Sequence, residues 1–407
     1  MSVFAQIARS PALRLAALAM VFLGLQNASI APYVSLVAIE KVGLTESAFA
    51  LVLAVGAVIA VVSAVLFGVI GDQTGRRRGI AIFTAIASVI GIVLMVINPT
   101  PLALVLCHAI LLPLGSSLYG QSFALARLAS PTSGAGGQDS ILGTVRAGMS
   151  ITFMAMLMFW TYAFGTGLDV LWTYSAALIA ATSLALLIAL QWPSGSKVTW
   201  DDRPSGLPLR QSLTELARPA VAIRLFILGA ISSSFLIYFI LIGLVFAQSP
   251  NRDASDVALY VGLVAGWEVP LLILIPRLLA YTSRTVLIAA GSALYGLHIL
   301  FLPIWVDTAW LWLGTLIAGL GGTAFIGLTI GYYQDLLQDR PGAAGAMLAL
   351  QKLVADLMAA GIFAAGVALG GYIVVSVFSF SLTILGALAI WAVDRYAAPK
   401  APAVLKM

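Results

Sequence analysis

The chain has 407 residues, of which 61% are hydrophobic and only 9% are charged. Soluble domains carry about 25% charged residues because water must solvate their surface, so a soluble domain is excluded and most of this surface faces lipid. The net charge of +5 at pH 7 is scattered between apolar blocks, and we therefore expect no nucleic-acid partner. The single cysteine, Cys107, excludes a disulfide framework and a thiolate metal site within the chain.

Apolar segments long enough to cross a bilayer recur along the sequence. A transmembrane helix needs about 20 apolar residues, and all of its backbone groups pair within the helix. Arg9 and Arg14 before the apolar residues 15–25 imitate a secretory signal, but the similar segments that follow favour a first transmembrane helix. We predict an all-α membrane protein with about twelve transmembrane helices. They lie near residues 12–35, 47–70, 78–98, 101–128, 140–164, 168–191, 219–247, 255–280, 285–305, 308–336, 343–368 and 371–395.

A polar linker divides these helices into two groups. Residues 193–218 combine prolines and glycines with a raised share of charged residues, a composition that breaks helices. The sequence therefore predicts a six-helix half over residues 1–192, a cytoplasmic linker over 193–218 and a second six-helix half over 219–407. Transporters built from repeats have this layout.

The positive charges predict the orientation. Cytoplasmic loops are enriched in Lys and Arg. If the N-terminus is cytoplasmic, the opposite side keeps only Lys41 and Arg252, so both termini are predicted to be cytoplasmic. The cytoplasmic cations are then Arg9, Arg14, Arg76, Arg77, Arg78, Arg127, Lys197, Arg203, Arg210, Arg218, Arg224, Arg277, Arg284, Arg340, Arg395, Lys400 and Lys406.

The turn between the second and third predicted helices is rich in glycine and arginine, and residues 68–78 read GVIGDQTGRRR. It resembles the signature of the major facilitator superfamily, in which a helix end carries an aspartate, a glycine and a basic cluster. Small residues permit close packing and Asp72 can face a helix N-terminal dipole, which favours a conformational latch over a plain basic turn. The expected latch residues are Gly71, Asp72, Gly75, Arg76, Arg77, Arg78, Arg127 and Asp335.

Further segments are similar to the sugar efflux transporters of that superfamily, over nearly the whole chain. They are residues 123–127 (FALAR), 145–147 (VRA), 265–270 (AGWEVP), 334–336 (QDL) and 340–344 (RPGAA). The chain departs from the family pattern at 151–158 (ITFMAMLM), where members carry Gly-Pro, and at Lys352 and Asp356. The resemblance implies a monomeric, proton-coupled exporter of a sugar or glycoside in the bacterial inner membrane. Its expected partners are a small-molecule substrate, protons and the lipid bilayer, with no cofactor and no metal.

Four ionisable residues lie deep within predicted helices, where a charge costs about 2.5–3.5 kcal/mol and usually faces a cavity or a partner. Lys352 and Asp356 are spaced i, i+4 and can pair, either as a structural bridge or along the solute pathway. Glu268 lacks a basic residue within one helical turn, and the membrane interior favours its protonated form. We expect Glu268 to couple transport to protons, with Arg146 as its counter-charge. A purely structural bridge between these two is the alternative.

Polar and aromatic side chains within the predicted helices suit a neutral polyol. Amides bond sugar hydroxyls and aromatic rings cover the apolar face of the ring, although each such residue alone is more often a helix-packing contact. His108 and His298 lack a carboxylate or a second histidine at ligand spacing and are expected to be packing residues. The candidate substrate-binding residues are Gln26, Asn27, Gln121, Ser233, Ser234, Tyr238, Trp267, Tyr332 and Tyr333.

Other classes of membrane protein explain the sequence less well. A membrane enzyme would need a paired His and carboxylate motif, a metal-ligand cluster or a nucleophile elbow, and none is found. Residues 134–137 (GAGG) lack the lysine and hydroxyl residue of a phosphate-binding loop, which disfavours a primary pump. The main alternative is a proton-coupled multidrug or amino-acid exporter, because the methionines between Met149 and Met158 can form an adaptable site. A receptor stays open because fold does not fix function.

Overall fold

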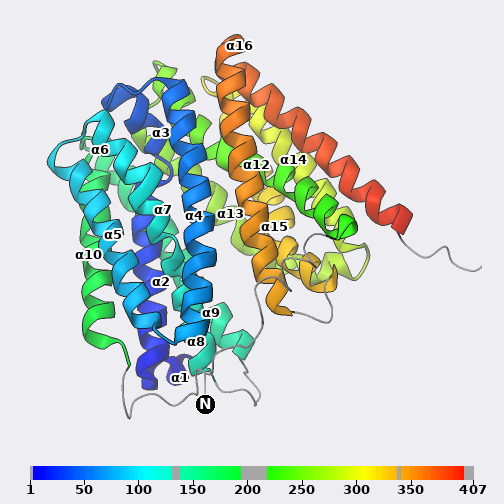
Figure 1. Cartoon of the computed structure of the whole chain (residues 1–407). Coiled ribbons are helices and arrows are strands. Elements are labelled where there is room, and N and C mark those ends of the chain that lie inside the picture. The colour runs from blue at the N-terminus through cyan, green and yellow to red at the C-terminus, as the bar shows by residue number, and fades with distance from the viewer. Residues whose placement is uncertain (1–2, 131–137, 194–217, 337–340, 398–407) are drawn as a thin grey trace, which may run out of the picture. The chain divides into compact units, whose positions relative to one another are not determined.

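A computed structural model describes residues 3–130, 138–193, 218–336 and 341–397 of the chain, and every regular element in these ranges is a helix (Figure 1). The chain forms two compact units. Unit 1 comprises residues 1–213 and 238–263, and unit 2 comprises residues 214–237 and 264–407. Nearly all of the predicted linker lies outside the described residues, so the division of the chain into two halves at residues 193–218 stays a prediction.

Unit 1 contains the helices of the N-terminal part of the chain. Several of its transmembrane segments are broken into shorter elements, among them two π-helical turns, η1 and η2. The elements are α1 (Val3–Arg9), α2 (Pro11–Ile30), α3 (Val34–Leu36), η1 (Val37–Lys41), α4 (Glu46–Thr74), α5 (Arg77–Ile97), α6 (Pro101–Val105), η2 (Leu106–Leu111), α7 (Leu112–Gly115), α8 (Ser117–Ala129), α9 (Gln138–Gly165) and α10 (Trp172–Gln191).

The remaining helices are long. Part of α12 and part of α13 belong to each unit, whereas the helices that follow belong to unit 2. The elements are α12 (Pro219–Gln248), α13 (Ala254–Leu279), α14 (Arg284–Trp305), α15 (Leu311–Leu336) and α16 (Pro341–Ala397).

Short polar residues fix where several helices begin. The side chains of Ser10, Thr45, Thr100 and Ser283 each accept a hydrogen bond from the backbone N–H three residues on, at the starts of α2, α4, α6 and α14. Such caps satisfy one of the N–H groups that a helix start leaves without an intrahelical partner. Proline stands in the first turn of α2 and α6, where the missing N–H costs nothing.

The core of unit 1 is built around α2. One face of α2, which includes Leu15, packs against residues of α5, α8 and α10, among them Ala85 and Leu184. Another packs with α8 and α9 through Met20 and Ile141 among others. Because α2 contributes buried residues to both clusters, it lies at the centre of this helix bundle.

Within the described residues, ten helices are long and apolar enough to span a membrane. One of them lies in α16, which runs as one element through Gly370 and Gly371 and there folds back on itself (Figure 1). Gly371 has φ +76° and ψ −159°, a region open essentially only to glycine. Dividing α16 at these two glycines adds one span to the ten, and counting the 26-residue α13 adds another. The helices then correspond to the twelve predicted segments, and the predicted all-α fold is confirmed.

The π-helical turn η2 widens the segment between α6 and α7. It carries His108, whose Nε2 lies 2.7 Å from the hydroxyl of Tyr174 on α10, with the two rings edge to face. His108 is therefore used in packing within unit 1, as predicted. His298 on α14 is 1% exposed and packs against the ring of Tyr295.

Candidate functional site

The glycine- and arginine-rich turn closes α4. Gly75 has φ +65° and caps the helix by donating its N–H to the carbonyl of Gly71 at 3.0 Å, a conformation that favours glycine. The side chain of Arg77 lies back over Gly71, and Arg78 Nη2 donates to the carbonyl of Ala189 on α10 at 2.9 Å. The arginines therefore fasten this turn within unit 1.

Asp72 is the central residue of the expected latch. The side chain of Asp72 lies outside what the structure describes, whereas its backbone belongs to α4. Arg76 is exposed at the N-cap of α5, and Arg127 is exposed in the last turn of α8. The latch itself stays a prediction.

The last expected latch residue, Asp335, pairs with an arginine of the same unit. Arg284 Nη1, at the start of α14, lies 2.5 Å from Asp335 Oδ2. The guanidinium covers Gly331, one turn before Asp335, where a Cβ would lie 2.7 Å from Nη1. Glycine at this position therefore lets the arginine lie flat against α15, where it reaches the carboxylate.

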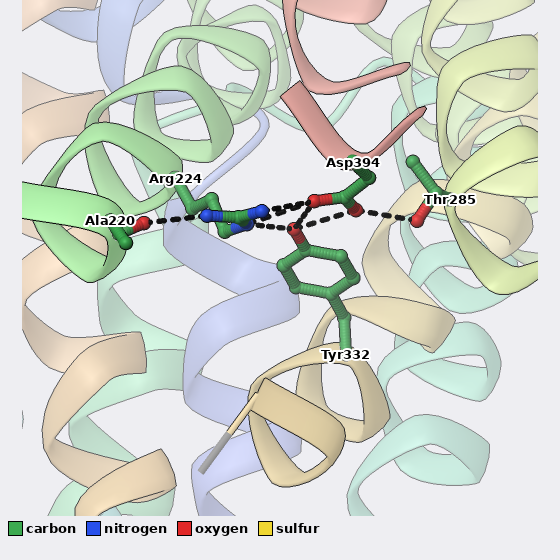
Figure 2. Close-up of polar contacts among 5 residues, drawn as sticks. All are labelled: Ala220, Arg224, Thr285, Tyr332 and Asp394. Atoms are coloured by element: carbon green, nitrogen blue, oxygen red, sulfur yellow. Dashed lines mark hydrogen bonds and ion pairs between the residues drawn. The ribbon is translucent and has the colours of Figure 1, made fainter. Parts of the chain in front are cut away.

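A polar network joins four helices of unit 2 (Figure 2). Arg224 on α12 donates from Nε to Asp394 Oδ1 at 2.8 Å, and its Nη2 lies 2.8 Å from the same oxygen. The hydroxyl of Tyr332 on α15 accepts from Arg224 Nε at 3.0 Å and donates to Asp394 Oδ2 at 2.9 Å. Thr285 on α14 also donates to Asp394 Oδ2, at 2.7 Å, while Arg224 Nη1 donates to the carbonyl of Ala220.

This network leaves both buried charges well paired. The side chain of Arg224 is 8% exposed and that of Asp394 is 21% exposed. A buried ion pair offsets its desolvation only when further hydrogen bonds satisfy its remaining donors and acceptors, and Tyr332, Thr285 and Ala220 supply those bonds. The sequence analysis names Tyr332 as a solute-binding candidate and Arg224 as a cytoplasmic cation, and it does not predict that they meet at Asp394. The signal in the sequence that could have indicated the site is Asp394, an aspartate near the end of the apolar segment 371–395.

Glu268 lies half-buried on α13, where that helix packs closely against α15. Its Oε1 is 3.3 Å from the position that a Cβ on Gly322 would occupy, and Trp267 Cβ is 2.5 Å from the corresponding position on Gly319. Two glycines one helical turn apart thus let the helices approach. Among the described residues of unit 2, the carboxylate has no hydrogen bond and no ion pair.

The other three predicted intramembrane charges have different surroundings. Arg146 is exposed and lies about 12 Å from the start of α9, within the candidate membrane span Ile141–Gly165. It belongs to unit 1 and Glu268 to unit 2, so their pairing stays a prediction. Lys352 Nζ lies 2.5 Å from Asp356 Oδ2 on α16, with side chains 65% and 13% exposed, and the ion pair predicted from their spacing is therefore present.

Six of the nine candidates for solute binding are buried in this conformation: the five described in this paragraph and Gln121. Ser233 and Ser234 donate their hydroxyls to the carbonyls of Ala230 and Ile231 within α12, at 2.7 and 2.6 Å. The rings of Tyr238, Tyr332 and Tyr333 are buried as well, and the hydroxyl of Tyr332 belongs to the network described above. A solute would have to displace existing contacts to reach these groups.

Three further candidates are at least partly exposed to solvent, and the fourth, Gln121, has a buried oxygen without a hydrogen-bond partner. On α2, Gln26 is half-buried and Asn27 is exposed, and neither side chain makes a hydrogen bond among the described residues of unit 1. Gln121 donates at 3.5 Å to the carbonyl of Phe67, while its buried Oε1 has no partner. Trp267 is 41% exposed and its Nε1 donates to Thr315 at 3.3 Å.

Comparison with known proteins agrees with the all-helical architecture of the chain. A family model described as the Major Facilitator Superfamily matches residues 16–361. The chain belongs to this superfamily. The resemblance predicted from the turn at residues 68–78 is thereby confirmed, and the protein is a multi-pass membrane transporter of the major facilitator type.

A relative and two solved structures extend this assignment. A Deinococcus radiodurans protein named "Putative sugar efflux transporter" is 24% identical over 401 residues, which cover 93% of this chain and 97% of that protein. A crystal structure of a nucleoside transporter NupG mutant matches with a TM-score of 0.78 at 14% identity, over 94% of this chain and 100% of that one. A crystal structure of a POT family transporter in complex with 5-aminolevulinic acid matches with a TM-score of 0.76 at 12% identity, over 95% of this chain and 96% of that one. Both structures share the major facilitator fold.

Proposed function

We propose that this major facilitator transporter exports a small polar solute, a sugar or glycoside, in exchange for protons. Transport proceeds by alternating access in the bacterial cytoplasmic membrane, with both termini cytoplasmic as the distribution of Lys and Arg predicts. The similarity to the Deinococcus radiodurans protein over 93% of the chain supports the solute class and the direction of transport.

The position of Glu268 carries this proposal. Its carboxylate lies half-buried between α13 and the glycines of α15, and no cation of unit 2 among the described residues pairs with it. A carboxylate in such a place exchanges its charge with a proton when water reaches it, because burial disfavours the ionised form. Proton binding drives a conformational change only if the two states hold the proton with different affinity. A half-buried, unpaired carboxylate meets that condition when its access to water differs between the states.

Both units offer groups suited to a polyol. The amides of Gln26 and Asn27 on α2 are not engaged by the described residues of unit 1, and amides bond sugar hydroxyls. The partly open ring of Trp267, held by its bond to Thr315, provides an apolar face and directly precedes Glu268. A solute that contacts Trp267 would lie close to the proposed proton site, which gives a physical route to coupling.

Transport assays in proteoliposomes test the proton site. Glu268→Gln keeps the size of the side chain but cannot titrate, so we expect it to abolish solute movement driven by a pH gradient while solute-for-solute exchange continues. Radiolabelled sugars, drugs and amino acids are screened first with the parental chain to choose the solute. Glu40→Gln is the matched control, because Glu40 is an exposed glutamate at η1, and it should retain both modes.

Two outcomes would contradict this mechanism. Intact pH-driven transport by Glu268→Gln would show that the proton moves elsewhere. An equal loss of driven transport and exchange, together with lower thermal stability in detergent, would instead assign Glu268 a structural role.

A multidrug or amino-acid exporter is the second candidate, and the methionines of α9 favour it. Met158 is 40% exposed, and Met154 and Met156 are half-buried, so flexible thioethers are available to an apolar solute. Export of lipophilic drugs but not sugars in the same screen would select this alternative.

A further inference from the structure

An apolar groove runs along the surface of unit 1 between α5 and α10. Its free volume is about 250 Å³. The lining positions recur every three or four residues on each helix, so they form one stripe on each, roughly 10 Å long at 1.5 Å per residue. The lining residues are Ile82, Ile86, Val89, Thr182, Ala185, Leu186 and Ala189.

The groove opens on a surface that only lipid can cover favourably. Ile86 is 48% exposed and Leu186 is 56% exposed. Beside the groove, Phe83 on α5 and Ile179 on α10 are 53% and 70% exposed. A continuous exposed apolar surface on a transmembrane helix pair is the surface that contacts acyl chains.

One end of the groove carries a fixed positive charge. Arg78 Nη2 donates to the carbonyl of Ala189 at 2.9 Å, and Ala189 itself lines the groove. This bond holds the exposed guanidinium at the end of the groove and uses one of its five N–H donors. Arg78 is also the second residue of α5, a 21-residue helix whose N-terminus favours anions.

We propose that this groove is a binding site for one anionic phospholipid. An acyl chain lies between α5 and α10, and the phosphate lies at Arg78. The order of the two parts matches that of a phospholipid, because the positive charge lies at one end of the apolar groove and the head group lies at one end of the acyl chain. A bilayer lipid of no net charge would occupy the groove equally well but would gain less binding energy from Arg78.

Native mass spectrometry of the detergent-purified full chain tests the site. The protein is titrated with phosphatidylglycerol or phosphatidylcholine of identical acyl chains. We expect the first phosphatidylglycerol to bind about 5-fold more tightly than phosphatidylcholine, the effect of about one arginine near an anionic head group. Arg78→Gln should reduce this ratio to about one, whereas Ala189→Phe, which fills the groove, should weaken the binding of both lipids.

Matched controls separate the site from general effects of charge and apolar surface. Arg277→Gln removes an exposed arginine in the last turn of α13, and Ile179→Ala trims an exposed residue of α10 outside the groove; both should bind lipid as the parental chain does. The proposal is overturned if Arg78→Gln keeps the parental ratio, or if Arg277→Gln lowers the ratio as much.

A second measurement avoids any dependence on variants. Phosphatidylglycerol with a photoreactive acyl chain is cross-linked to the parental protein, and the labelled peptides are mapped. Concentration of the label on residues 79–90 and 182–191 supports the site. Labelling spread evenly over the apolar helices would show that only ordinary annular lipid is present.

Discussion

Replacing Asp394 with leucine removes the acceptor at the centre of the network in Figure 2. Arg224 loses both of its contacts with the carboxylate and keeps only those with Tyr332 and Ala220. The hydroxyl of Thr285 loses its acceptor as well. The substitution therefore leaves a guanidinium that is 8% exposed with an unpaired charge.

The expected loss of stability is large for one side chain. Breaking a buried ion pair by removing one partner costs about 3–5 kcal/mol, because the remaining charge stays desolvated. Asp394 is 21% exposed, so water can partly replace it and we expect the lower end, about 3 kcal/mol. The double variant Arg224→Met with Asp394→Leu should recover most of this loss, since apolar residues of similar volume often replace a buried pair without cost.

Unfolding by denaturant in a mild detergent measures these free energies as a double-mutant cycle. The exposed pair of Lys41 and Asp169, with side chains 39% and 48% exposed, is the control, and Lys41→Met should cost about 0–1 kcal/mol. If Asp394→Leu costs no more than Lys41→Met, or if the two substitutions in the network are additive, the network does not hold α12, α14, α15 and α16 together.

Three further predictions test other parts of the structure. Gly371→Ala should destabilise the chain by about 1–3 kcal/mol, because alanine cannot adopt φ +76° and ψ −159° without strain; thermal unfolding in detergent measures this. Burial opposes ionisation of Asp169, but hydrogen bonds from Lys41 and from a backbone N–H, with the charge of Lys41, lower the pKa of Asp169 below 3.8. The ionised Asp169 should therefore stabilise the fold fully above the pKa that it has in the unfolded chain, and this stabilisation should be lost as pH falls through its lower pKa in the folded chain. Asp169→Asn should remove this part of the dependence of Tm on pH. Lys352→Met should reduce folded yield more than Asp356→Leu, because the carboxylate is the more buried partner, and the double variant should be milder than Lys352→Met.

Each of these predictions has a control or a contradicting result. Gly361→Ala lies in the same helix with open space around its Cβ position and should be stable, so an equal loss at both glycines would exclude backbone strain. Parallel Tm curves for Asp169→Asn and the parental chain below pH 4 would contradict the pairing of Asp169 with Lys41. Simple additivity at Lys352 and Asp356 would contradict a direct ion pair.

The helices could be predicted from the sequence because their signal is local. Some 20 consecutive apolar residues leave few alternatives in a membrane, and the structure has helices at all the predicted positions. The pairing of Lys352 with Asp356 was equally accessible, since the i, i+4 spacing places both side chains on one face of a helix.

The network around Asp394 could not be predicted, because it depends on which helices meet. Its residues come from four helices, and Arg224 and Asp394 are 170 positions apart in the sequence. The exposure of Arg146 could not be predicted for a related reason. An apolar run does not show which side of its helix faces a neighbour, and Arg146 is exposed although it lies within the span Ile141–Gly165.

The wide turn η2 between Leu106 and Leu111 has a consequence for comparing this transporter with its relatives. A π-helical turn accommodates one residue more than an α-helical turn. A relative without it should therefore show a one-residue gap within this stretch when the two sequences are aligned. Deleting one residue from η2 should therefore let this turn close as an α-helical turn, while the segments on its two sides keep the faces that they now present to their neighbours. His108 lies within the wide turn, so its contact with Tyr174 is the one that we expect to change.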